Sequence, residues 1–232
     1  MNARMSAAGA WIVGFGLMAE AAFGAEQNLV KNGDFEKGRP GGNGPEGWEA
    51  PVSGREWVDL GGEHGRIVRF TIPHKIAISD GFKYFSDKFP IQEGRTYRCQ
   101  VDIRTFGPSV VVFLQGLTTF RGQERQIYEK QIKSDKRVKA REWSTLDFEF
   151  TPQTSTAVSA KVLERRKLDL PHVEMLRVEF FGYSTEYYGY RSPDGGVVEF
   201  DNVRIVEKPA AAGNASTQPQ SRPTGSSATM KP

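Results

Sequence analysis

The stretch TYRCQVDIRTF (residues 96–106) alternates apolar and polar side chains along its length. Alternate side chains of an extended chain point to opposite faces, so the stretch predicts a strand with one face against a core. The apolar residues predicted to point inward are Tyr97, Cys99, Val101 and Ile103. The polar residues predicted to point outward are Arg98, Gln100, Asp102 and Arg104.

Other short runs have the same character, being rich in Val, Ile, Phe and Tyr and separated by Gly, Pro, Asp and Ser clusters. They are GRIVRFTIP (65–73), SVVVFLQGL (109–117), WSTLDFEFTP (143–152), EMLRVEFFGY (174–183) and GVVEFDNVRIV (196–206). The charged segment 125–139 lacks an apolar helical stripe and is interpreted as a charged connection or hairpin. Many short strands without intervening helices predict an all-β fold, an antiparallel two-sheet β-sandwich.

The two ends of the chain differ in composition from the part between them. Residues 1–24 carry one early positive charge, an apolar run and a small-residue close, which is typical of a cleaved signal peptide. The apolar run is shorter than the roughly 20 residues of a membrane span, so no span is expected after cleavage. We therefore expect a secreted or periplasmic protein, with a β-sandwich domain over 26–208 and a disordered Pro/Ser/Thr/Ala-rich tail over 209–232.

Composition limits the classes of fold and partner. Among 232 residues, 38% are hydrophobic and 15 are Phe, which is enough apolar mass for one sizeable core. The single cysteine, Cys99, excludes an intramolecular disulfide framework. The formal charge of +3 is too small to argue for a nucleic-acid partner, so none is expected. The oligomeric state stays open.

The stretch NLVKNGDFEKG (28–38) opens the expected mature chain. Residues 28–30 are predicted to form an edge strand, followed by a turn in which Gly33 supplies a positive φ and after which Phe35 enters the core. Asp34 and Glu36 then share the opposite side of the chain. If the first and last strands are neighbours, Glu36 and Asp201 could meet at one calcium ion completed by backbone carbonyls. The spacing alone favours the alternative, in which these residues are solvated acids at strand ends.

Two terminal motifs carry a family resemblance. NLVKNGDFEKG, with its glycine loop leading to Gly47 and Trp48, and VEFDNVRIV (198–206) resemble the opening and closing strands of carbohydrate-binding modules of families 4, 9 and 22. These modules are jelly rolls of the galactose-binding-like superfamily. GRTYRCQVDIRT (94–105) and WSTLDFEFTP look like two of their inner strands, while the charged stretch 121–141 departs from the family pattern as an insertion.

The resemblance implies a noncatalytic protein that binds an oligosaccharide or polysaccharide. It also implies a structural calcium ion between the first and last strands, on matching positions at Glu36 and Asp201 with Asp34 as a further ligand candidate.

Two polar rows and one loop are candidate ligand-binding surfaces. Sugars need hydrogen-bonding groups beside aromatic rings, and such a mixture occurs on the outward side of two predicted strands and in an aromatic loop. The first row is Arg98, Gln100, Asp102 and Arg104; the second row is Arg177, Glu179, Phe181 and Tyr183; the loop carries Tyr187, Tyr188 and Tyr190. The alternative for the rows is simple solvation, and for the loop it is packing over one end of the sandwich.

Two other classes of function stay open. A jelly-roll glycan hydrolase or lyase is one, although His64, His74 and His172 lack a second ligand at metal spacing and no pair of acids is singled out. A matrix or surface interaction protein is the other. It would bind acidic polymers through basic runs at 130–141 and 161–167 and would lose affinity steeply with salt.

Overall fold

The computed structural model describes residues 27–134, 138–154, 171–183 and 195–209. The predicted signal peptide, the tyrosines Tyr187, Tyr188 and Tyr190, and the predicted tail after Pro209 lie outside the described residues. None of the helices in these ranges has the length and hydropathy that a membrane crossing requires.

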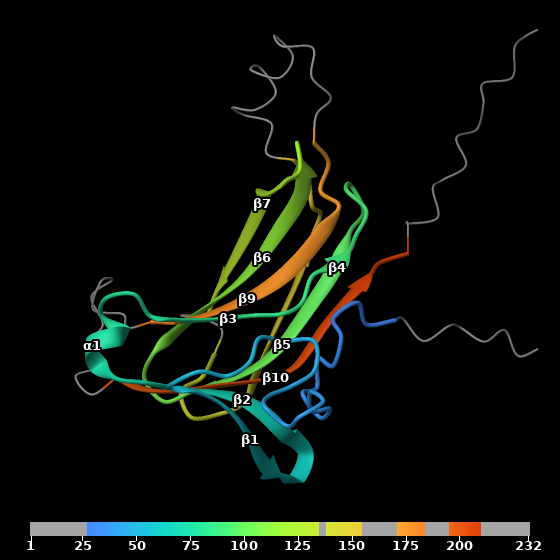
Figure 1. Ribbon diagram of the computed structural model, residues 1–232. Coiled ribbons are helices and arrows are strands. Elements are labelled where there is room, and N and C mark those ends of the chain that lie inside the picture. Colours follow the sequence, from blue (N-terminus) through green and yellow to red (C-terminus); the bar gives the residue numbers. More distant parts are fainter. Residues whose placement is uncertain (1–26, 135–137, 155–170, 184–194, 210–232) are drawn as a thin grey trace, which may run out of the picture.

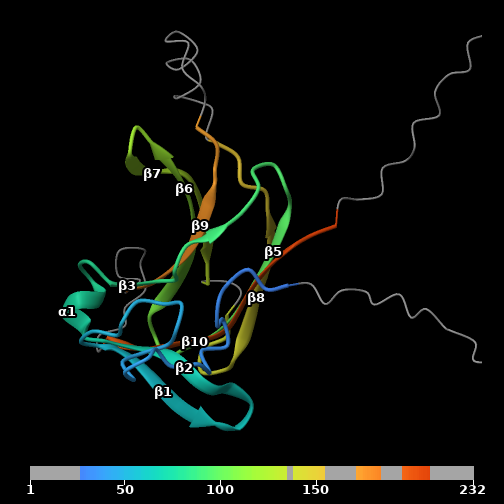
Figure 2. The same cartoon turned by 45° about the vertical axis from the view of Figure 1, so that its right-hand side comes forward.

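The described chain forms two antiparallel sheets that pack face to face (Figures 1 and 2). The sheet that we call the β5 sheet has the order β1 (Arg55–Gly61), β2 (Gly65–Ile72), β10 (Gly196–Glu207), β5 (Tyr97–Thr105) and β8 (Ser144–Phe150). The β9 sheet has the order β3 (Phe82–Phe85), β9 (Met175–Tyr183), β6 (Ser109–Phe120) and β7 (Gln123–Lys133), with β4 (Phe89–Pro90) also paired to β9. The short helices are η1 (Gly62–His64) and α1 (His74–Ala77). The predicted antiparallel two-sheet β-sandwich is confirmed.

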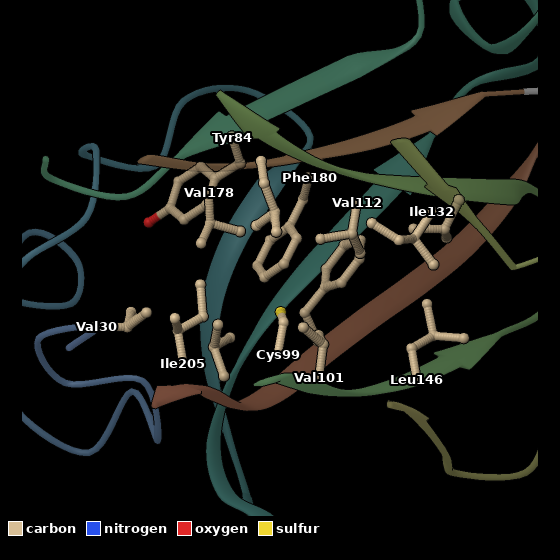
Figure 3. Close-up of a cluster of buried hydrophobic side chains, with 14 of the residues drawn as sticks. Val30, Tyr84, Cys99, Val101, Val112, Ile132, Leu146, Val178, Phe180 and Ile205 are labelled. Carbon is tan, nitrogen blue, oxygen red and sulfur yellow. The ribbon is translucent and has the colours of Figure 1, made fainter. Parts of the chain in front are cut away.

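The core lies between the sheets and is built from the alternating positions. The four apolar residues of β5 that were predicted to point inward are all buried, and Cys99 has no exposed surface. In Figure 3, Cys99 and Val101 point toward Val112 and Phe180 of the opposite sheet. The rings of Phe180 and Phe200 stack across the two sheets with centroids 4.1 Å apart. Burial raises the pKa of the Cys99 thiol, so the side chain behaves as a small apolar group.

The first described segment runs beside β10, but the predicted edge strand at residues 28–30 is wrong. Two backbone bonds join it to the sheet: Leu29 N–H donates to the Ile205 carbonyl at 2.8 Å, and Val203 N–H donates to the Gly33 carbonyl at 2.8 Å. The side chain of Asn28 makes the neighbouring bonds instead, donating to the Val203 carbonyl at 2.9 Å and accepting from Ile205 N–H at 2.9 Å. Because a side-chain amide satisfies β10 at these positions, the segment needs no regular ladder.

The turn that follows also differs from expectation. The positive φ angles fall on Asn32 (50°) and Phe35 (55°), not on Gly33. Gly33 is required for another reason, since a Cβ atom there would lie 1.9 Å from the Val203 carbonyl oxygen. Phe35 is fully buried, as predicted, and its ring centroid lies 4.9 Å from that of the buried Trp48.

The charged stretch after β6 is the second strand of a hairpin, one of the two interpretations that the sequence allowed. Strand β7 pairs with β6 over most of its length, and Arg121 (φ 53°) and Gly122 (φ 74°) make the turn. Two successive positive φ angles are typical of the tight turns that match the twist of a hairpin. Strand β7 forms one edge of the β9 sheet and carries mostly exposed polar residues.

Candidate functional site

The two predicted polar rows lie on opposite outer faces of the sandwich. Arg98, Gln100, Asp102 and Arg104 point outward from β5, while Arg177, Glu179, Phe181 and Tyr183 point outward from β9. The whole core separates the two rows. They therefore form two surfaces and not one site.

The outer face of the β5 sheet is filled by ion pairs between its own side chains. Glu199 is 2% exposed, and its Oε1 accepts hydrogen bonds from Arg69 Nε at 2.9 Å and Nη2 at 2.7 Å. Its Oε2 accepts from Arg104 Nε. Further along the face, Arg98 donates to both carboxylate oxygens of Asp147 and lowers the pKa of that carboxyl. A buried carboxylate held by two guanidinium groups is a stable structural unit only while all its partners stay in place.

The remaining polar residues of this row are held in the same way. Gln100 donates to Asp147 Oδ2 at 3.2 Å. Asp102 accepts from Thr145 Oγ1 at 2.5 Å and from Asn202 Nδ2 at 2.9 Å. These contacts engage each predicted residue of the β5 row with a neighbour in the protein.

The tryptophans near this face are also in contact with protein groups. His64 stacks on Trp143 with ring centroids 3.9 Å apart, and the Arg104 guanidinium lies 4.8 Å from the same ring. Trp57 donates from Nε1 to the Phe35 carbonyl at 2.9 Å, and Arg66 lies 4.2 Å from its ring. Both rings thus serve the packing of the chain itself.

The outer face of the β9 sheet has a buried carboxylate at its centre. Glu179 is 2% exposed, and its pKa is raised by burial, an effect that Lys83 and Arg177 partly oppose. Its Oε2 accepts a hydrogen bond from Gln115 Nε2, and Gln115 Oε1 in turn accepts from Arg177 Nε at 2.6 Å. The ammonium group of Lys83 lies 3.2 Å from Oε1.

Aromatic rings surround this carboxylate. In the ladders on either side of β9, Glu179 lies opposite Phe85 of β3 and Phe113 of β6. The ring centroids of Phe113 and Phe181 lie 6.1 Å apart. The Phe181 ring stacks on the Tyr183 ring with centroids 5.1 Å apart and an angle of 12° between the ring planes. We call Phe113, Phe181 and Tyr183 the aromatic row. Its rings are half-buried, so they are fixed in place and still present a surface to solvent.

Three members of this face were missed at the sequence level, namely Lys83, Phe113 and Gln115, while the sequence left Phe85 open between sugar stacking and burial. Strand β3 is only four residues long and shows no recognisable alternation. Strand β6 is apolar on both faces, since Val111 and Leu117 are buried on its outer side, so its pattern does not show which residues point outward. The one available signal was Gln115, a polar residue inside an apolar strand.

The three predicted metal ligands have separate surroundings. Asp34 is exposed, and Glu36 Oε1 accepts from Arg66 N–H at 2.8 Å. Asp201 is buried and interacts with His64 Nδ1 at 2.7 Å and with Asn202 N–H at 2.7 Å. Within the described ranges, no group of three His, Cys, Asp or Glu side chains is placed to hold a metal ion. The described donors thus do not form a common calcium cage, and calcium stays a prediction from the family resemblance.

The described part of the first basic run is solvent-exposed. Lys130 and Lys133 lie on β7, and Lys139 and Arg141 lie in the segment before β8. The rest of this run, Lys136 and Arg137, and the whole second run lie outside the described residues.

Comparison with known proteins gives likenesses among solved structures only. No family model matches the chain, and no curated protein matches it. A family 4 carbohydrate-binding module (CBM4) is 14% identical, covering 77% of this chain and 99% of its own, with a TM-score of 0.42. The N-terminal CBM22-1 and CBM22-2 tandem domain of Paenibacillus barcinonensis Xyn10C is 11% identical, covering 82% of this chain and 52% of its own, with a TM-score of 0.46.

A third solved structure contains the CBM22-1 and GH10 modules of a Clostridium thermocellum endo-1,4-β-D-xylanase in complex with xylohexaose. It is 14% identical, covering 80% of this chain and 28% of its own, with a TM-score of 0.40. Families 4 and 22, which the terminal motifs resemble, are thus both among the matches. At these identities and TM-scores the likeness gives no ligand and no site residue.

Proposed function

We propose that this chain is an exported, noncatalytic carbohydrate-binding protein that binds a glycan on the outer face of the β9 sheet. One observation supports it above others: the aromatic row lies beside the buried pair of Glu179 and Gln115. A pyranose ring stacks its C–H face on an aromatic ring while its hydroxyls exchange hydrogen bonds with planar polar groups. Half-buried rings and fixed polar groups lose little conformational freedom on binding.

The outer face of the β5 sheet is the weaker candidate. A sugar hydroxyl there would have to compete with Arg69 and Arg104 for a carboxylate that both already hold. Removing a partner from a buried ion pair costs several kcal/mol, which a single sugar hydrogen bond does not offset. The face of the β9 sheet has fewer such pairs, and the ammonium group on its carboxylate belongs to the largely exposed side chain of Lys83.

Affinity electrophoresis and titration calorimetry test this proposal with the purified protein. The probes are soluble xylan, mixed-linkage β-glucan, hydroxyethylcellulose and chitosan at low and moderate salt, with polygalacturonate as an acidic comparison. Phe181→Ala and Tyr183→Ala should each weaken binding about 2- to 10-fold, the range expected for one aromatic contact. Phe106→Ala is the matched control, because Phe106 is a 40% exposed phenylalanine at the end of β5.

Three outcomes would contradict the proposal. Unchanged affinity in both aromatic variants would exclude this face and direct attention to the loop with Tyr187, Tyr188 and Tyr190. Binding confined to acidic polymers and lost at moderate salt would favour the basic runs. Release of shorter products from a bound polymer would show that the protein is an enzyme.

A further inference from the structure

An ammonium group of the protein itself occupies the centre of the proposed binding face. Lys83 lies directly opposite Phe181 in the ladder between β3 and β9. Its Nζ is 3.2 Å from Glu179 Oε1 and 5.6 Å from the centroid of the Phe181 ring. The lysine thus contacts the carboxylate and the aromatic row at once.

The surroundings of Glu179 suit a cation of this kind. A carboxylate that is 2% exposed is costly to ionise unless a positive charge lies close to it. Aromatic faces attract an ammonium group in addition, because the ring quadrupole is negative above the ring. The Phe181 ring provides such a surface to Lys83. Phe85 and Phe113 lie opposite Glu179 in the ladders on either side of β9.

The contact of Lys83 is also the one on this face that can be given up most easily. Its side chain is 56% exposed, and its Nζ lies beyond the 2.7–2.9 Å of a strong charge-assisted hydrogen bond. A lysine ammonium on a flexible four-carbon stem can turn to solvent and regain its hydration. Arg177 is held more firmly, by its bond to Gln115 at 2.6 Å and its position 4.4 Å from the Phe85 ring.

The charge that leaves with Lys83 decides which ligand can replace it. A neutral sugar would offer hydroxyl hydrogen bonds to Glu179 but would leave the buried negative charge with less compensation. A uronic acid would place a second carboxylate beside the first, and like charges in such a position repel. An amino sugar carries an ammonium group on a pyranose ring. Its ammonium group can take the place of the Lys83 ammonium group beside Glu179 while its ring stacks on the aromatic row.

We propose that the glycan bound on this face carries free amino groups, as glucosamine polymers do, and that Lys83 occupies the ammonium position until the glycan displaces it. This inference rests on the proposed function and names the ligand class for the same site. Glu179 is the group that distinguishes an amino sugar from its acetylated or neutral counterpart, and Lys83 is an internal competitor.

Calorimetric titration with three matched oligosaccharides tests the inference. The probes are the hexamers of glucosamine, of N-acetylglucosamine and of glucose in β-1,4 linkage, at about pH 6, where a substantial share of such amino groups carries a proton. The wild type should bind the glucosamine hexamer most tightly. Lys83→Ala should bind it about 10-fold more tightly than the wild type, since the competitor is gone, and Glu179→Gln should bind it at least about 10-fold more weakly.

Lys208→Ala is the matched control for the loss of one positive charge. Lys208 is an exposed lysine that pairs with the exposed Glu149 of the β5 sheet, so its removal should leave the affinity unchanged. Melting curves show whether each variant is folded. If Glu179→Gln does not fold, the comparison of Lys83→Ala with Lys208→Ala still decides the question.

The failures of the two proposals are distinguishable. Equal affinity for all three hexamers, with no gain in Lys83→Ala, would overturn the amino-sugar inference and leave the binding face in place. Weaker binding of the glucosamine hexamer in Lys83→Ala would also overturn it, because the lysine would then assist the ligand. No detectable binding of these hexamers or of xylan, mixed-linkage β-glucan, hydroxyethylcellulose and chitosan would overturn the proposed function itself.

Discussion

His64 and Asp201 lie 137 residues apart in the chain, and their side chains meet at 2.7 Å on the outer face of the β5 sheet. His64 belongs to the turn between β1 and β2, whereas Asp201 lies within β10. The His64 ring also stacks on Trp143, next to β8. One side chain therefore joins three separate elements, and it holds the β1–β2 turn against the face of the sheet.

This contact predicts a dependence of stability on pH. Burial raises the pKa of Asp201 to about 6, although hydrogen bonds from His64 and Asn202 oppose the rise. Between about pH 4 and pH 6 the folded state therefore holds a proton that the unfolded state has released. The free energy of unfolding should fall as pH rises through this window, by about 1.4 kcal/mol per pH unit and about 3 kcal/mol in all from this group.

Urea unfolding at several pH values measures this effect. Other carboxylates titrate in the same range, so the informative quantity is the difference between the wild type and Asp201→Asn. That difference should change by up to about 3 kcal/mol between about pH 4 and pH 6, because the amide does not titrate. A difference that is constant over this range would show that Asp201 has an ordinary pKa.

The calcium ion predicted from the family resemblance has a separate test. A calcium site at Asp34, Glu36 and Asp201 would share the Asp201 carboxylate with His64 and Asn202 N–H. Such a site predicts that calcium raises the melting temperature at pH 7 relative to a chelator. Glu36→Gln and Asp201→Asn should each abolish that rise. Identical melting temperatures of the wild type in calcium and in chelator would remove the metal assignment.

The sequence predicted the sandwich well because alternation is a local property. Strands β2, β5, β6, β8, β9 and β10 all correspond to runs of apolar residues that the sequence marks clearly. The burial of Cys99 and the exposure of Arg98 follow directly from the period of two. Pairing between distant strands is not local, so the sequence did not show that the rows of β5 and β9 would lie on opposite faces.

The binding face illustrates a second limit. Phe113 and Gln115 come from β6, where apolar side chains occupy both faces and hide the outward positions. Lys83 and Phe85 come from a four-residue strand whose only guide is its partner, β9. Residues of this kind acquire a role through register, which depends on contacts between segments far apart in sequence.

The close approach of the first segment to β10 predicts that Gly33 tolerates no side chain. In Gly33→Ala the new Cβ would lie 1.9 Å from the Val203 carbonyl, so either the segment or β10 must move. We expect a loss of more than about 2 kcal/mol in the free energy of unfolding, measured with urea. Gly41→Ala is the control: its Cβ would meet nothing within 4 Å, and only its φ of 95° is unfavourable, at about 1 kcal/mol. An equal loss in both variants would contradict the packing described for residues 28–33.

The β5 face holds buried ion pairs and the β9 face is the proposed binding surface. A substitution on the β5 face should therefore lower mainly stability, and one on the β9 face should lower mainly glycan affinity. Arg104→Ala removes one of the two guanidinium groups on Glu199 and should lower the free energy of unfolding by about 3 kcal/mol, because it leaves a buried carboxylate with one partner. Its affinity for a bound glycan should equal that of the wild type. Phe181→Ala, on the half-buried aromatic row, should lower glycan affinity with a smaller loss of stability. Measuring unfolding and binding on both variants separates the faces, and a folded Arg104→Ala protein with weakened binding would move the glycan to the β5 sheet.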